Sequence, residues 1–134
     1  MDRNKVTYLC PHCRAALNAK RNIILAAYAE SDKKNKGLVL LHEEIGNYAV
    51  AITSTLTINV GDKVNFHCPV CHKSLNSVKG EDLADFIRVE NDRESHIVIS
   101  RIYGERCTFQ IDERKKVKSY GETVKKFIDP EWFL

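Results

Sequence analysis

The chain has 134 residues, of which 43% are hydrophobic and 29% are charged, a composition typical of a soluble globular protein. Its 21 Lys and Arg residues outnumber its 18 Asp and Glu residues, which gives a formal net charge of +3. These values exclude an intrinsically disordered chain. No apolar run is long enough to span a membrane, and the first residues lack the apolar core of a signal peptide. We therefore expect a cytoplasmic protein, with reduced cysteines and no membrane contact.

The first distinctive element is the Cys-Pro-x-Cys turn at residues 10–13, and a near-identical turn follows at residues 68–71. Lys5 and Val6 match Lys63 and Val64 at the same offset of 58 residues. An offset that persists outside the turns indicates an internal repeat. The predicted organisation is one domain, 1–134, with two homologous halves at about 5–60 and 63–118 and a C-terminal tail at 119–134.

Strands are predicted after each turn. Segments 22–30 and 80–89 are rich in apolar residues; Leu83, Phe86 and Ile87 also have helical spacing, but we favour strands in both places. Residues 38–41 form a further short apolar run, closed by a turn around Gly46 and Asn47. The coarse fold class is therefore mainly β.

A longer strand with one buried face is predicted across residues 48–58, where large apolar and small residues alternate. In the second half the corresponding alternation places Cys107, Phe109 and Ile111 on the buried face. At an offset of 58 the two buried faces do not coincide. We therefore expect a one-residue slip, through a bulge or a turn of different length, ahead of the second strand.

The paired cysteines carry the main chemical prediction. Zinc in structural sites takes four thiolate or imidazole ligands in a tetrahedron, and each Cys-Pro-x-Cys turn supplies two sulfurs. Two such turns in a reducing compartment indicate a metal site rather than disulfides. We predict one structural zinc ion, favoured over iron, held by Cys10, Cys13, Cys68 and Cys71.

These two knuckles resemble those of zinc-ribbon proteins, in which Cys-Pro-x-Cys turns lead β-hairpins. The resemblance covers the knuckles and their flanking strands, and it implies two pseudosymmetric knuckle-plus-hairpin halves that share one zinc. Many ribbons have Gly directly after the second cysteine, whereas Arg14 and His72 stand there in this chain. The 54 residues between Cys13 and Cys68 also exceed the usual spacing, so each knuckle is expected to carry an elaborated hairpin.

Other cysteines and histidines have simpler interpretations. Cys107 is predicted to be a small buried hydrophobe, since no neighbouring base would activate it as a nucleophile. His12, His67 and His72 lie beside the ligands, and four cysteines already complete the tetrahedron, so we expect supporting or surface roles. A thioredoxin-like redox role lacks the required βαβ context.

A zinc-dependent deaminase is the enzyme hypothesis that we considered. It would combine His42 and Glu44 with Cys68 and Cys71. The deaminase signature places proline before the first cysteine, whereas Pro69 lies between these two, and the first knuckle would be left without a role. We therefore predict no enzymatic activity.

The C-terminal part supplies the candidate partner-binding residues. Segment 112–126 carries six Lys or Arg residues against three acidic ones, a pattern suited to phosphate contacts. Residues 127–134 contain five large apolar side chains, which would pack on the domain itself or anchor a partner. The candidates are Arg114, Lys115, Lys116, Lys118, Trp132 and Phe133.

The resulting prediction is a non-catalytic structural-zinc module that acts as a protein-interaction adaptor or small accessory subunit. Its partner would be another protein, and free strand edges would allow a homodimer. The alternative is a nucleic-acid-binding zinc-ribbon regulator that uses the basic segment 112–126.

Overall fold

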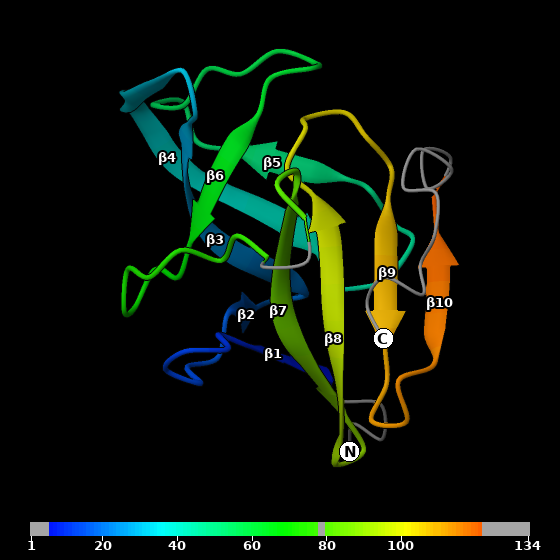
Figure 1. Cartoon of the computed structure of the whole chain (residues 1–134). Helices are drawn as coiled ribbons and strands as arrows, with labels where there is room; N and C mark the ends of the chain where they lie inside the picture. Colours follow the sequence, from blue (N-terminus) through cyan, green and yellow to red (C-terminus); the bar gives the residue numbers. More distant parts are fainter. Residues whose placement is uncertain (1–5, 78–79, 122–134) are drawn as a thin grey trace.

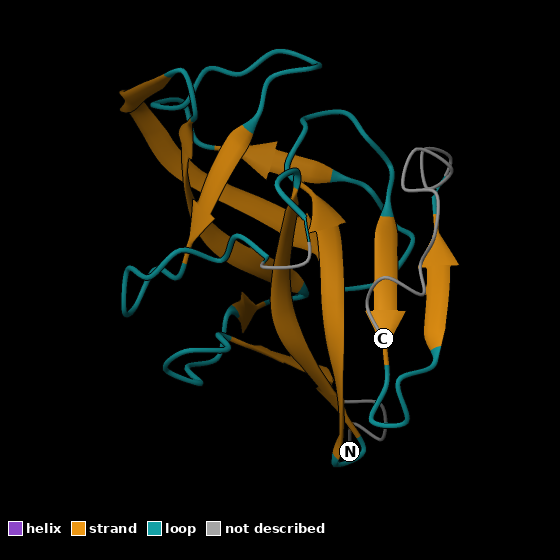
Figure 2. Ribbon diagram, viewed as in Figure 1, coloured by secondary structure: helices purple, strands orange, loops and turns teal. Residues whose placement is uncertain are grey.

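The computed structural model describes residues 6–77 and 80–121 (Figure 1). Regular structure in this part of the chain consists of β strands (Figure 2), and it contains no helix that could span a membrane. One antiparallel sheet has the order β1 (Val6–Leu9), β7 (Leu83–Glu90), β8 (Arg93–Ser100), β9 (Thr108–Ile111) and β10 (Val117–Tyr120). The second contains β2 (Asn18–Ala19), β3 (Asn22–Ala29), β4 (Asp32–His42) and β5 (Val50–Ile52), with β6 (Val64–His67) also paired to β3.

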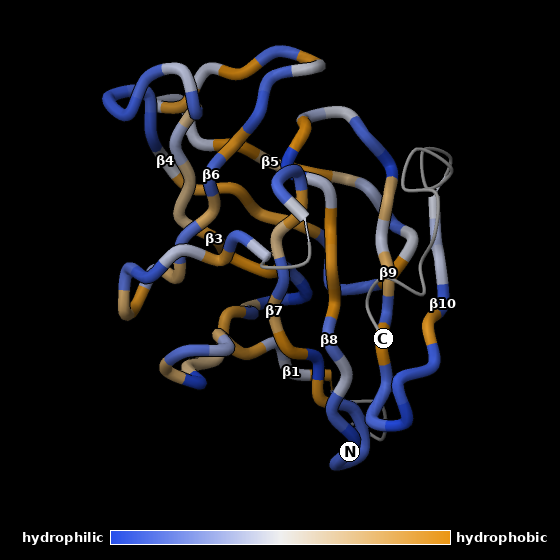
Figure 3. Tube along the Cα trace, viewed as in Figure 1, coloured by the Kyte–Doolittle hydropathy of each residue, from blue (hydrophilic) through white to orange (hydrophobic). Residues whose placement is uncertain are grey.

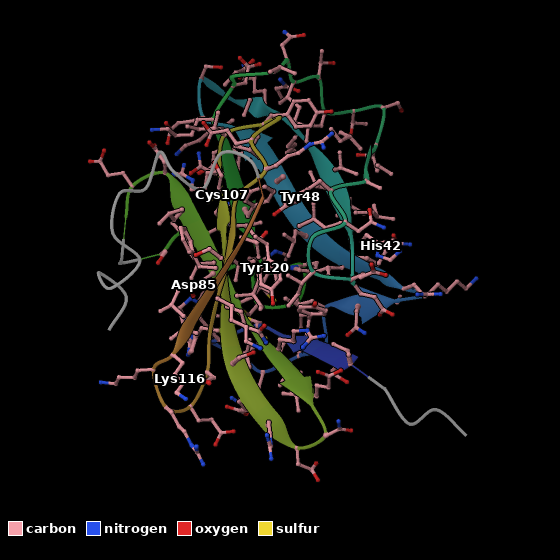
Figure 4. All side chains as sticks on the ribbon, turned by 90° about the vertical axis from the view of Figure 1, so that its right-hand side faces the viewer. His42, Tyr48, Asp85, Cys107, Lys116 and Tyr120 are labelled. Atoms are coloured by element: carbon pink, nitrogen blue, oxygen red, sulfur yellow. The ribbon has the colours of Figure 1, made fainter. Side chains whose placement is uncertain are left out.

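The two sheets lie as facing layers, with Tyr48 and Tyr120 labelled between them in Figure 4. The burial pattern of strand β3 explains this packing of one sheet against the other. Every second side chain along β3 is buried, including Ile23 and Leu25. Such alternation places one face of a strand against the core and leaves the other towards solvent. Tyr8 and Phe86 reach the same core from β1 and β7, with their rings edge to face at 5.7 Å. Hydrophobic residues accordingly follow the strands, and hydrophilic residues gather at the turns (Figure 3).

Both ambiguous segments of the sequence are strands. Segment 22–30 contains β3, and segment 80–89 is largely β7, which together with β8 forms a tight hairpin. The predicted burial of Cys107, Phe109 and Ile111 is also confirmed, although Thr108 between them is buried as well. The prediction of a mainly β fold is therefore correct.

The strands that lead into the knuckles pair in an unexpected way. Strand β1 pairs with β7, with Leu9 opposite Ile87, and β6 pairs with β3, with His67 opposite Ala26. Each knuckle was expected to belong with the hairpin that follows it in sequence. In the structure each knuckle strand instead forms a ladder with the hairpin that follows the other knuckle.

The strand predicted across residues 48–58 is wrong in extent, because β5 covers only Val50–Ile52. After Ile52 the chain turns over β4: the Thr53 N–H donates to the Leu38 carbonyl over 3.1 Å, and the Leu56 N–H donates to the Thr53 carbonyl over 3.1 Å. Val50 is 39% exposed, so the apolar alternation does not mark a buried face there. Of the large apolar side chains in the predicted strand 48–58, only Leu56 is buried, and it enters the core from the turn.

The expected one-residue slip is also absent from its predicted place. The β4–β5 ladder closes at Leu41 opposite Val50, and the β8–β9 ladder closes at Ile99 opposite Thr108. The two connections therefore have equal length. A register irregularity does occur, but it lies between Tyr28 and Ala29 in the β3–β4 hairpin.

A buried arginine joins the two sheets where they meet. Arg101 follows β8, is 5% exposed, and donates from Nε to the Val64 carbonyl over 3.0 Å. Its guanidinium also donates to the Asn65 side-chain oxygen over 2.5 Å, to the Glu30 carboxylate over 2.8 Å and to the Glu81 carbonyl. The hydrogen bond from Arg101 lowers the pKa of Glu30, although the partial burial of that carboxyl acts in the opposite sense. A buried charge of this kind is tolerated because its donors are paired.

Candidate metal centre

Four cysteine sulfurs meet between the two knuckles, where the loops after β1 and β6 project on the same side of the molecule (Figure 1). The Sγ atoms of Cys10, Cys13, Cys68 and Cys71 all lie within 4.8 Å of one another. Two distances cross from one knuckle to the other: Cys10 to Cys71 is 3.8 Å and Cys13 to Cys68 is 3.7 Å. A tetrahedral ion with metal–sulfur bonds of about 2.3 Å separates its ligand sulfurs by about 3.8 Å. The spacing of the cluster therefore fits a tetrahedral metal ion.

The local backbone explains how each knuckle presents its sulfurs. In the first knuckle the N–H groups of His12 and Cys13 point at the Cys10 sulfur, over 3.3 and 3.5 Å. In the second, the two corresponding N–H groups point at the Cys68 sulfur over 3.3 and 3.4 Å. These dipoles stabilise negative charge on sulfur, which is the form that binds a metal.

The residue after each knuckle has a left-handed backbone conformation. Arg14 has a φ of 61° and His72 a φ of 65°, and each donates its N–H to the carbonyl of the first cysteine of its knuckle. Glycine adopts this conformation without a steric penalty, whereas other residues pay about 1–2 kcal/mol. The sequence departs from the zinc-ribbon pattern at these two positions, but the backbone keeps the geometry for which glycine is suited.

The two buried thiols of the cluster differ in how readily they ionise. Cys10 and Cys68 are fully buried, whereas Cys13 is exposed and Cys71 is intermediate. Burial opposes ionisation of Cys68, but the N–H groups of its own knuckle and the thiols of the other knuckle lower its pKa to about 7. Burial raises the pKa of Cys10 to about 12 against the opposing effect of its knuckle N–H groups. A bound cation would favour the thiolate form of all four.

Histidines surround the cluster without joining it. His12 Nε2 lies 3.0 Å from the Ser74 carbonyl, which links the first knuckle to the loop after the second. The His67 ring stacks on Tyr28 with centroids 4.9 Å apart. His42 accepts the N–H of Glu44 at Nδ1 over 3.0 Å and is not among the clustered ligands. This contact between His12 and Ser74 joins residues 62 apart in the sequence, and no local sequence pattern predicts it.

Cys107 lies outside the cluster, among apolar side chains of β8 and β9 that include Val98 and Phe109. It is 1% exposed. Burial, with a smaller contribution from the charge of Glu105, raises the pKa of Cys107 to about 12. Its predicted role as a small buried hydrophobe therefore agrees with its surroundings.

The basic segment begins in a tight turn between β9 and β10. Asp112 accepts the backbone N–H groups of Arg114 and Lys116, each over 2.9 Å, and these bonds, that of Lys116 first, lower its pKa. Arg114 and Lys116 share a groove with acidic residues that include Glu90 and Glu94, so the described surface there is of mixed sign. Lys115 belongs to the same turn and Lys118 to β10. The remaining candidates, Trp132 and Phe133, lie outside the described residues.

No family model, curated protein or solved structure matches the chain. The resemblance to zinc ribbons therefore rests on the knuckles, and the structure supports its coarser part: four cysteines within metal-binding distance in an all-β fold.

Proposed function

We propose that this protein is a structural-zinc module without catalytic activity, and that it acts as a protein-interaction adaptor or small accessory subunit in a reducing compartment such as the cytoplasm. One observation carries the proposal: four sulfur ligands at tetrahedral spacing come from two knuckles. Catalytic zinc sites keep a coordination position open for water or substrate, whereas four thiolates close the tetrahedron. The resulting site would join two parts of the fold and leave no position for a substrate.

Zinc is the ion that we propose, because a closed tetrahedron of four sulfurs suits zinc or iron and zinc needs no redox partner. Two measurements separate the metals. Elemental analysis of the purified full chain is expected to give one zinc per chain, and cobalt substitution is expected to give the visible bands of tetrahedral sulfur coordination. A protein isolated with stoichiometric iron would contradict the zinc assignment, and one isolated without metal and unable to take up cobalt would contradict the metal centre.

We further propose that the two halves are related by an internal pseudo-twofold axis through this metal. Equivalent hydrogen bonds support it: Cys10 and Cys68 each donate their N–H to the carbonyl five residues later, over 3.0 Å in both cases. The cross-pairing of β1 with β7 and of β6 with β3 has the same symmetry. A duplicated knuckle would explain why one ion draws two ligands from each half.

The adaptor role is proposed from an exposed apolar residue at a knuckle. Val70, at the tip of the second knuckle, is 60% exposed. An exposed apolar side chain beside the cysteine cluster suits a protein contact. Affinity purification of the tagged full chain should recover a stoichiometric protein partner. The Val70→Glu variant should lose this partner, and Leu38→Glu, on strand β4, should retain it.

Titration with DNA and RNA at two salt concentrations addresses the alternative function. Because Arg114 and Lys116 share their groove with acidic residues that include Glu90 and Glu94, we expect no binding even at low salt. Tight, salt-dependent binding would favour the nucleic-acid regulator over the adaptor.

A further inference from the structure

An apolar cavity of about 270 Å³ lies between the two sheets, separate from the cysteine cluster. Its walls come from both layers and from the strands that lead into the knuckles: Ile23 and Leu41 on one side, Ile97 and Ile99 on the other, and Tyr8 from β1. Aliphatic and aromatic side chains of this kind line most small-molecule sites.

Two loops contribute exposed residues to the lining of the cavity. One follows β4 and contains Gly46, and the other follows β8 and contains Gly104; both glycines have a positive φ. The charged residues Glu44 and Arg106 belong to these loops and are exposed to solvent. Arg101 also lines the cavity and is buried, but its guanidinium is already paired with oxygens of the protein. The rest of the buried lining is mainly apolar.

Two hydroxyls in the cavity wall, those of Tyr8 and Tyr48, already have partners within the protein. The Tyr8 hydroxyl donates to the Glu43 carbonyl over 2.5 Å and accepts from Arg88 Nε over 3.1 Å. The Tyr48 hydroxyl donates to the Tyr120 carbonyl and lies within bonding distance of the Thr108 hydroxyl, both over 3.0 Å (Figure 4). A charged or strongly polar ligand would lose its hydration there without gaining a free partner.

We propose that this cavity is a binding site for an uncharged apolar small molecule larger than benzene. An engineered protein cavity of about 150 Å³ stays dry and binds benzene, so a cavity of about 270 Å³ has room for an apolar skeleton of two or three rings. Its partly open form gives such a molecule a path to the interior. This site is independent of the structural-zinc proposal, although Tyr8 and Phe66 in its wall stand two residues before Cys10 and Cys68.

The test uses the full, metal-loaded chain and N-phenyl-1-naphthylamine, an uncharged probe with a naphthalene and a phenyl ring that fluoresces in apolar surroundings. We expect saturable binding of one probe per chain, and at least tenfold weaker binding of the anionic probe 1-anilinonaphthalene-8-sulfonate. Leu41→Trp places extra volume in the cavity and should weaken binding of the neutral probe at least tenfold. Leu38→Trp is the matched control, because Leu38 lies on the same strand, is 38% exposed and does not line the cavity. The affinity of this variant for the neutral probe should stay within twofold of the wild-type value.

Methyl NMR spectra of the wild-type chain provide a second readout that needs no substitution. The probe should shift the methyl resonances of Ile97 and Ile99 and leave those of Leu38 in place. The proposal is overturned by an absence of saturable probe binding, by equal affinity for the neutral and anionic probes, or by shifts confined to residues outside the cavity. A folded Leu41→Trp variant with wild-type affinity would overturn it as well.

Discussion

Replacing Cys68 by Ser removes one of the two fully buried sulfurs of the cluster. A serine hydroxyl is not an ionised sulfur at neutral pH, so only three good ligands remain and the two knuckles lose their common anchor. We expect the variant to lose bound metal and with it most of the stability of the fold. Treatment of the wild-type protein with a chelator should have the same effect.

The size of the effect follows from the number and type of ligands. Structural zinc binds small modules with apparent free energies of about 10–16 kcal/mol at neutral pH. These free energies refer to 1 M zinc, and at about 0.1 mM free zinc the stabilisation is smaller by about 5.5 kcal/mol. Bound zinc therefore stabilises the folded state by about 5–10 kcal/mol. A typical domain is stable by only about 5–15 kcal/mol in total. The metal-free chain should therefore be largely unfolded or only marginally stable.

The assay is urea or thermal unfolding followed by circular dichroism, with metal content measured on the same samples. Cys107→Ala is the matched control, because it removes a buried cysteine that is not part of the cluster. That variant should keep one metal per chain and lose only the few kcal/mol expected of a small core truncation. A metal-free protein with an unchanged unfolding midpoint would refute a structural role for the ion.

Three further predictions concern residues around the site and the core. His72→Gly should stabilise the folded, metal-bound protein by about 0.5–1 kcal/mol in urea unfolding, because glycine relieves the left-handed backbone at a φ of 65°; a lower midpoint would show that the side chain contributes more than the strain costs. Arg101→Met should lower the free energy of unfolding by about 3–5 kcal/mol, since it leaves buried oxygens unpaired. As a control, Arg93→Met, at an exposed arginine, should change it by less than about 0.5 kcal/mol. Because Arg101 lowers the pKa of Glu30, this pairing stabilises the folded protein at a pH above the unfolded pKa of Glu30, and the stabilisation is lost on acidification. The difference in unfolding free energy between Arg101→Met and the wild type should therefore shrink as the pH falls below that pKa. Equal differences at pH 7 and pH 3 would contradict the pairing. Cys107, with its pKa raised to about 12, should resist iodoacetamide at pH 8 in the folded protein, and rapid alkylation of the native protein would show that the thiol is accessible. Above the ordinary thiol pKa only the unfolded state ionises, so the free energy of unfolding should fall by about 1.4 kcal/mol per pH unit.

The local features of this fold could be predicted because short stretches of sequence determine them. A Cys-Pro-x-Cys turn directs its own N–H groups at its first sulfur, so both knuckles are recognisable without knowledge of the rest of the chain. The strand alternation of β3 and the buried position of Cys107 follow equally from residue-by-residue patterns. The meeting of the two knuckles was predicted from the number of ligands that a tetrahedral ion requires.

Long-range pairing could not be predicted in the same way. Strand β1 would satisfy its backbone hydrogen bonds against either hairpin, and nothing in residues 6–9 specifies β7 over β3. The misassigned strand at 48–58 has a similar origin. Gly37, on β4, has so little space around it that an added Cβ would lie 2.2 Å from the Thr53 hydroxyl, and this close approach accompanies the turn after β5. A single glycine far away in sequence carries no visible sign of that contact.

The exchange of knuckle strands between hairpins also determines when the chain can fold during its synthesis. Strand β1 is complete at Leu9, but its partner β7 is complete only at Glu90, and the last sulfur ligand is residue 71. At about 5–20 residues per second, the ribosome takes about 4–16 s to make the intervening chain. Until residue 71 has been made the chain has no complete metal site, and β1 remains without its partner until β7 follows. The β3–β4 hairpin lies wholly within the first half and needs no later segment, whereas β1 and the cysteine cluster reach their final arrangement only when the second half is present.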